Sequence, residues 1–134
     1  MKLSGCLVLL LLAAPSPAGA RCLAYEPSVV SLVGKLASKT VPGPPNYTSI
    51  ARGDLPEVVF TLHLEAPVCV SANPTSTLNS ASRSGILEVQ LVIPVSRARP
   101  WVGKRVRATG SLFKGHTGHH RTPVILHVSA LRAT

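Results

Sequence analysis

The sequence predicts an all-β fold in one small exported domain, and three observations support this prediction. Five short runs rich in β-branched residues alternate with turn-forming residues, and no long amphipathic helical pattern occurs. A hydrophobic segment at the amino terminus has the form of an export signal. Two cysteines that follow this segment can close a small domain with one disulfide.

The first 20 residues have the pattern of a secretory signal peptide. Lys2 precedes an apolar run over residues 7–14, and Ala18-Gly19-Ala20 supplies the small side chains of a cleavage site. This run is shorter than the roughly 20 apolar residues of a membrane-spanning helix, so we expect no transmembrane segment after cleavage. We therefore expect a signal peptide over 1–20, a single domain over 21–134 and a periplasmic or secreted location.

The first two predicted strands lie on either side of a proline-rich stretch. Residues 29–36 form the first strand, and Gly34 within it indicates the tight bend that a small barrel needs. A proline-rich stretch over 41–45 then stops regular structure. Residues 57–64 form the second strand, in which alternation separates apolar from outward-facing side chains. Its apolar face consists of Val58, Phe60, Leu62 and Leu64.

Three more strands complete the prediction. They span residues 86–93, 105–113 and 124–131, and each alternates or is continuously apolar. The serine-rich segment 71–84 reads as an exposed flexible loop, and residues 95–101 can hold a helical turn between strands three and four. The third strand presents Leu87, Val89, Leu91 and Ile93 on its apolar face and Ile86, Glu88, Gln90 and Val92 on the other.

The positions of the cysteines provide a test of this strand arrangement. Signal cleavage removes Cys6 and leaves Cys22 and Cys69, whose pairing an oxidising destination favours. In the chain-entropy model, a closed loop of this length contributes about 4 kcal/mol. The two residues lie just beyond the open end of the first predicted hairpin, which is where a bridge can form. Five strands, a glycine-bent first strand and a connection between strands three and four fit a five-stranded OB-like barrel, with an SH3-like barrel or a small sandwich as the alternative.

The last third of the chain carries the most distinctive motifs. They are the segments 103–106 and 110–113, followed by the histidine-bearing segment 115–124, which contains G-H-H-x-T-P-V. With the cysteine-bearing segments 22–27 and 64–69, these motifs resemble a bacterial exported domain family of unknown function. The resemblance implies a bacterial periplasmic setting and an OB-like barrel, and it implies no activity.

The loop between the last two strands contains the residues with the most chemical content. His116, His119 and His120 fall within five positions, and imidazole is the commonest nitrogen ligand of divalent transition metals, with His63 or His127 as a further ligand. A metal site is therefore one hypothesis, although neighbouring histidines rarely converge and no carboxylate lies nearby in sequence. A second hypothesis is that the histidines only fix the shape of a tight connection through hydrogen bonds.

A third hypothesis assigns ligand binding to a cationic rim. The side chains concerned lie on the same loop and at the start of the fourth strand, and an anion would be held by loop amides and basic side chains. Trp101 is the one aromatic residue placed to stack on a ligand, and it can equally cap the barrel core. The candidate ligand-binding residues are Trp101, Arg105, Lys114, His116, His119, His120 and Arg121.

Charge and missing motifs limit the functional classes. Without Lys2, 13 lysines and arginines stand against five acidic residues, which favours anionic partners such as envelope components or acidic proteins. Scarce aromatic residues and export disfavour nucleic acid. No nucleophile elbow, zinc-protease motif or phosphate loop occurs, so we expect a non-enzymatic binding module without a cofactor. A metal-binding protein and a structural or protein-interaction module are the alternatives.

Overall fold

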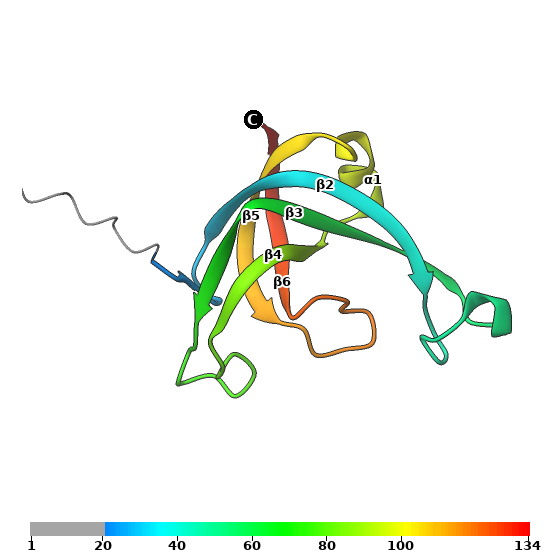
Figure 1. Ribbon diagram of the computed structural model, residues 1–134, viewed down its shortest axis with the longest axis horizontal. Helices are drawn as coiled ribbons and strands as arrows, with labels where there is room; N and C mark the ends of the chain where they lie inside the picture. The colour runs from blue at the N-terminus through cyan, green and yellow to red at the C-terminus, as the bar shows by residue number, and fades with distance from the viewer. Residues whose placement is uncertain (1–20) are drawn as a thin grey trace, which may run out of the picture.

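The computed structural model describes residues 21–134, so the predicted signal peptide lies outside the described residues. Within this range, no helix has the length and apolar character needed to cross a membrane. Three short helical turns, η1, α1 and η2, accompany six strands (Figure 1). The strands are β1 (Leu23–Ala24), β2 (Val30–Pro42), β3 (Pro56–Ser71), β4 (Arg83–Val92), β5 (Arg105–Lys114) and β6 (Val124–Ala133), and the turns are η1 (Ile50–Arg52), α1 (Val95–Ala98) and η2 (Arg99–Trp101).

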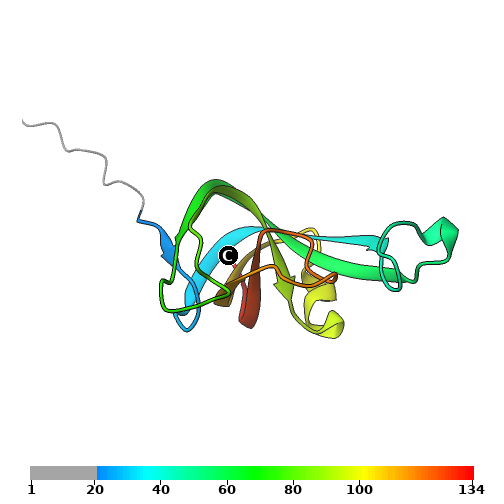
Figure 2. The ribbon, with the colours of Figure 1, turned by 90° about the horizontal axis from the view of Figure 1, so that it is seen from below.

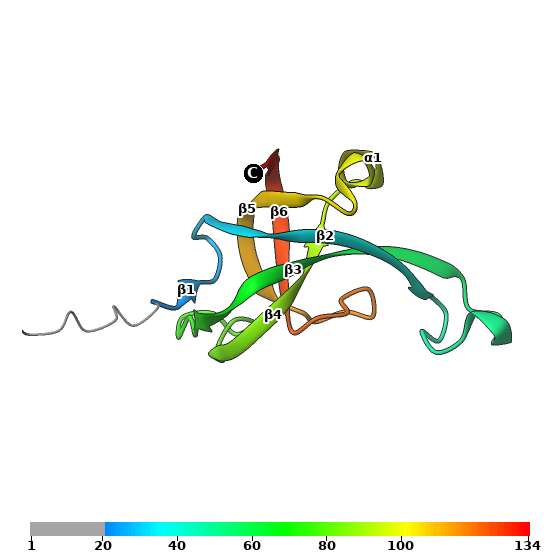
Figure 3. The same cartoon turned by 45° about the horizontal axis from the view of Figure 1, so that its top comes forward.

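The strands close into a five-stranded barrel, which confirms the predicted fold class. The sheet order is β1-β3-β2-β5-β6-β4, and β4 also pairs with β3, so the five long strands form a closed ring. Only β4–β6 is parallel within this ring, and α1 and η2 connect its third and fourth strands. Figure 3 shows β2 and β3 crossing over β5 and β6. The result is a small all-β, OB-like barrel.

Glycines allow the strands to coil closely at two points. A Cβ atom on Gly34 would lie 2.2 Å from the carbonyl oxygen of His63, and one on Gly110 would lie 2.0 Å from that of His127. Any other residue would force these paired strands apart. Gly34 therefore allows β2 and β3 to approach closely, and Gly110 allows the same close approach between β5 and β6.

The barrel core is filled by one row of side chains from each long strand. Leu36, Leu62 and Leu126 are fully buried in it. Two side chains predicted for this core are not there: Val58 is 42% exposed and Leu87 is 52% exposed. Val58 lies toward the hairpin arm, outside the closed barrel, and the β3–β4 pairing shifts register beside Leu87, which breaks strict alternation.

Strands β2 and β3 run further than predicted. The pairing of β2 with β5 covers only Val30 to Lys35, whereas its pairing with β3 continues to Pro42, opposite Pro56. The two strands therefore leave the barrel as a long hairpin arm that ends in the loop 43–55 (Figures 1 and 2). The prolines do not stop β2 because they lie at its end, where no third strand needs their missing N–H.

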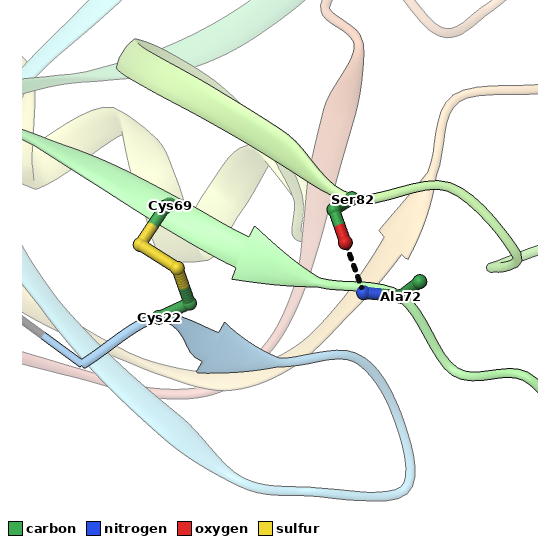
Figure 4. The surroundings of a disulfide bond; sticks show 4 residues. All are labelled: Cys22, Cys69, Ala72 and Ser82. Atoms are coloured by element: carbon green, nitrogen blue, oxygen red, sulfur yellow. Dashed lines mark hydrogen bonds between the residues drawn. A yellow bond between two sulfur atoms is a disulfide. The ribbon is translucent and has the colours of Figure 1, made fainter.

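The predicted disulfide joins Cys22 to Cys69, with the Cα atoms 4.6 Å apart (Figure 4). Its setting differs from the expected one, because Cys69 lies inside β3 and not beyond its end. The additional strand β1 pairs in parallel with β3, with Leu23 opposite Val70. The bridge therefore fastens the amino-terminal segment to β3, and Tyr25, 3% exposed, enters the core.

The serine-rich segment is also more closely held than predicted. Its loop folds against the barrel end, where Asn79 is only 2% exposed. The side-chain oxygen of Asn79 accepts the backbone N–H of Lys114 at 2.9 Å, and its nitrogen donates to Glu26 at 3.3 Å. Ala72 donates its N–H to the hydroxyl of Ser82 at 2.8 Å (Figure 4). These contacts bring segments distant in sequence together at one barrel end.

Candidate functional site

The histidine-bearing loop, residues 115–123, folds back onto the outer wall of the barrel. Gln90 on β4 holds it at two points and is only 6% exposed. The side-chain nitrogen of Gln90 donates to the carbonyl oxygen of His119 at 2.9 Å, and its oxygen accepts the backbone N–H of Arg121 at 2.5 Å. Thr122 accepts the backbone N–H of Gln90 at 3.0 Å. The loop therefore covers β4 and does not stand free at the rim.

Four side chains join this loop to the hairpin arm, and we call Tyr47, Glu57, His119 and Arg121 the loop clasp. The Glu57 carboxylate accepts hydrogen bonds from His119 Nδ1 at 2.6 Å and from Arg121 Nη2 at 2.9 Å. The Tyr47 hydroxyl lies 3.3 Å from His119 Nε2, and the Arg121 guanidinium lies 5.3 Å from the Tyr47 ring centre. A strand distant in sequence thus supplies the carboxylate that the loop itself lacks.

Electrostatics keep the loop clasp closed. Burial alone raises the pKa of Glu57, but the hydrogen bonds and charges of His119 and Arg121 outweigh it and hold that pKa below its ordinary value. Arg121 is largely buried, donates to the carbonyl oxygen of Pro42 and keeps a buried Nε that has no hydrogen-bond partner among residues 21–134. Arg121 is therefore a structural cation and not part of an open rim.

The hairpin-arm loop is rigidly held from inside. Asp54 is 4% exposed and accepts the backbone N–H groups of Asn46, Thr48 and Ser49 at 2.8 to 2.9 Å. The hydrogen bonds from Ser49 and Thr48 lower the pKa of Asp54 to about 2. The carboxylate of the Arg52-Gly53-Asp54 sequence thus faces inward and shapes the loop that presents Tyr47.

The other two histidines of the loop form a separate cluster with Phe113. The rings of His116 and His120 are 4.8 Å apart, and that of His120 is 5.3 Å from Phe113. His120 Nδ1 accepts the backbone N–H groups of His116 and Thr117, while His116 Nδ1 bonds the carbonyl oxygen of Lys114. Burial, followed by the charges of His116 and His119, lowers the pKa of His120. These histidines fix the loop's shape.

The structure does not assemble the predicted metal ligands. Across residues 21–134, no three histidine, cysteine or carboxylate side chains are positioned to hold one ion. His119 binds Glu57 in the loop clasp, whereas His116 and His120 pack edge to face with each other and with Phe113. The suggested fourth ligands are also apart, because His63 contacts Thr61 and His127 lies on β6. The physical reason is that neighbouring positions on the loop point to different sides.

The remaining candidates lie elsewhere on the barrel. Trp101 packs against the core with Lys104 5.7 Å from its ring, so it caps the barrel end. Arg105 is bonded to Glu65 through two nitrogens and to the hydroxyl of Thr134 at 2.8 Å. The residues expected to form a single cationic rim therefore lie in two places, some on the histidine loop and the others at a distant barrel end.

Several hollows mark the surface of residues 21–134, and two of them border the histidine loop. A groove of about 290 Å³ runs beside the histidine loop and is bordered by the exposed side chains of Val58, Val92 and Val95. A larger hollow of about 550 Å³ lies over β5 and β6, where Ser111 and Ser129 line it together with the exposed side chains of Glu26 and Val29 from the amino-terminal segment. A hollow of about 480 Å³ on the other side of the loop is lined by Lys39, Arg83 and Arg121. The loop is therefore bordered by one mixed groove and one basic hollow, whereas the hollow over β5 and β6 is lined by polar and apolar groups together.

Sequence reasoning missed three residues that organise this region. Gln90 and Glu57 carry the loop contacts, and Asn79 joins the barrel end. The one local signal was a glutamine alternating with long apolar residues on a strand, which indicates a polar group needing buried partners. Glu57 and Asn79 gave no such signal, because their partners lie 35 to 64 positions away.

Comparisons with known proteins agree with the resemblance in the last third of the chain. A family described as a domain of unknown function (DUF4431) matches residues 88–132, which include β5, the histidine loop and most of β6. No curated protein matches the chain. The chain is therefore similar, over about a third of its length, to a domain family to which no activity is assigned.

Proposed function

We propose that this protein is an exported, non-enzymatic binding module for an anionic ligand, either an acidic component of a cell envelope or an acidic protein. The observation that supports this proposal is that few of the protein's basic side chains form ion pairs. Of the 13 lysines and arginines in residues 21–134, only Lys39, Arg105 and Arg121 form ion pairs with described carboxylates. The other ten form no ion pair among the described residues.

The acidic residues are already used within the fold. Glu57, Glu65 and Glu88 hold the three ion pairs. Asp54 binds the backbone of its own loop, and Glu26 accepts from Asn79. Because five acidic residues cannot neutralise 13 basic ones, residues 21–134 keep a net positive charge that attracts anions and repels cations.

Separate observations support the proposed export and the proposed non-enzymatic role. A disulfide persists in oxidising compartments, and it fits the signal-like amino terminus of the sequence. The sequence contains none of the common catalytic motifs, and the candidate histidines hydrogen-bond to backbone groups or to Glu57. These features suit a rigid binding module in the periplasm or outside the cell.

Binding at physiological ionic strength tests this function. The purified protein with its disulfide intact would be titrated, at about 0.15 M salt, with polygalacturonate, dextran sulfate, phosphatidylglycerol vesicles and an acidic protein. We expect saturable binding to at least one of these probes, weakened by added salt, and none to neutral dextran. Absence of binding to all four anionic probes would overturn the proposal and favour a structural or protein-interaction module.

A further inference from the structure

Three basic side chains gather on the outer wall of the barrel, far from the loop clasp. We call Lys35, Arg107 and Arg132 the basic cluster, and all three are exposed. Arg107 on β5 lies directly opposite Arg132 on β6, and Lys35 on β2 lies opposite the neighbouring Arg105. Because directly opposed residues share a face of the sheet, the three side chains project together.

This arrangement works against folding. Like charges directly opposite each other destabilise a sheet, and none of the three side chains has an ion-pair partner among the described residues. Arg105 differs, because Glu65 and Thr134 hold its guanidinium. The basic cluster therefore retains its repulsion, which an anion placed above it would relieve.

Hydroxyl groups continue the same wall beyond the basic cluster. Thr109 lies two residues after Arg107 on β5, directly opposite Ser31 on β2, and the two hydroxyls are hydrogen-bonded to each other at 2.8 Å. The Ser129 hydroxyl donates to the carbonyl oxygen of Thr109 at 3.1 Å. Ser111 follows on β5 and lines, with Ser129, the hollow of about 550 Å³. A polar track thus leads from the basic cluster into the hollow.

We infer that this wall of β2, β5 and β6 is the binding site for an acidic polysaccharide. Carboxylate or sulfate groups would lie on the basic cluster, while sugar hydroxyls would bond to the serine and threonine hydroxyls and enter the hollow. This inference rests on the proposed function and deepens it, because it names the ligand class and the surface.

The composition of the wall favours a sugar chain over other polyanions. Strands β2, β5 and β6 carry no exposed large apolar side chain, so, within these described strands, nothing is available to insert into a bilayer. Single-stranded nucleic acids bind mainly by stacking on aromatic rings. Tyr25 and Phe60 are buried, Trp101 packs against the core, and Tyr47 and Phe113 contact the histidine loop. Hydroxyl groups beside cations match a hydrated, hydroxyl-rich polyanion.

A charge-matched pair of variants tests the site. Lys35→Gln, Arg107→Gln and Arg132→Gln are combined in one protein, and the control combines Arg21→Gln, Arg52→Gln and Arg83→Gln. Both remove three positive charges from exposed positions, so the two variants have the same net charge. Binding of polygalacturonate, dextran sulfate, phosphatidylglycerol vesicles and single-stranded DNA is then measured by titration at about 0.15 M salt.

We expect the parent to bind one of the two polysaccharides more tightly than vesicles or DNA. Whether polygalacturonate or dextran sulfate binds more tightly distinguishes a carboxylated from a sulfated chain as the ligand. The cluster variant should lose about tenfold or more in affinity, and the control about threefold or less. Thermal unfolding should show the cluster variant at least as stable as the parent, because repulsion is removed.

Two results would overturn the inference while leaving the proposed function intact. One is tighter binding of vesicles or DNA than of either polysaccharide. The other is an equal loss of polysaccharide affinity in the two variants, which would assign binding to net charge and not to this wall. Absence of binding to every anionic probe would overturn both proposals.

Discussion

The contact between Gln90 and the histidine loop yields the most direct prediction about stability. Replacing Gln90 with methionine keeps the length and nearly the volume of the side chain, so it opens no cavity. It removes the donor to the carbonyl oxygen of His119 and the acceptor of the Arg121 N–H. The backbone bond from Gln90 to Thr122 stays. The change therefore isolates the two side-chain hydrogen bonds that fasten the loop.

The magnitude follows from the environment of the groups left behind. A buried polar group that loses its partner costs about 1 to 3 kcal/mol. His119 is exposed, so water can reach its carbonyl group, whereas Arg121 is partly buried. We therefore expect the free energy of unfolding to fall by about 2 to 3 kcal/mol. With an m-value of about 1.5 kcal/mol per molar, the urea midpoint would fall by roughly 1.3 to 2 M.

Urea unfolding of parent and variant measures this loss, and Glu88→Met on the same strand is the control. Glu88 faces the same side of β4 but only forms a surface ion pair with Lys39 at 3.3 Å, which is worth about 0 to 1 kcal/mol. Amide exchange should also accelerate in residues 119–121 of the Gln90 variant. A loss no larger than that of the control would refute the reasoning that Gln90 fastens the loop.

Three further predictions concern the framework. Replacing Cys22 and Cys69 with serine should lower the free energy of unfolding by up to about 4 kcal/mol, measured in urea, and a loss below about 1 kcal/mol would contradict the entropic account. The pKa of Asp54, about 2 against an ordinary 3.8, means that its stabilisation is complete above that ordinary value and disappears as the pH falls through 2. Asp54→Asn should therefore flatten the acid limb of the stability curve, and identical slopes in the two proteins would disprove this role. Gly110→Ala should lower the unfolding free energy by about 3 kcal/mol, because the new Cβ meets the carbonyl oxygen of His127, and unchanged thermal unfolding would contradict the steric argument.

The features that sequence alone predicts are those encoded by neighbouring residues. Alternation located the five long strands, and two remaining cysteines indicated a disulfide. Each depends on residues within a few positions, or on a pairing with no competitor. The strand ends were less accurate, because pairing between β2 and β3 continues after the barrel contacts stop.

The site could not be predicted in the same way, because distant residues decide what each loop side chain does. Gln90 reads as outward-facing, and it is buried because the loop returns about 30 positions later to cover it. The sequence suggests that Arg121 is a free cation. In the structure it is ion-paired, because Glu57, 64 positions earlier, lies beside it. The sequence identifies the chemistry of both side chains, whereas their partners can be identified only from the fold.

The loop clasp also determines which wall of the barrel is free to bind. OB barrels commonly use the two loops that correspond here to residues 43–55 and 115–123. In this protein, Glu57 joins the two loops through His119 and Arg121, so a ligand that separates them would leave partly buried charges unpaired. The binding free energy of such a ligand would have to offset this cost. The wall that carries Lys35 and Arg107 exposes its charges without rearrangement, and binding there incurs no comparable reorganisation.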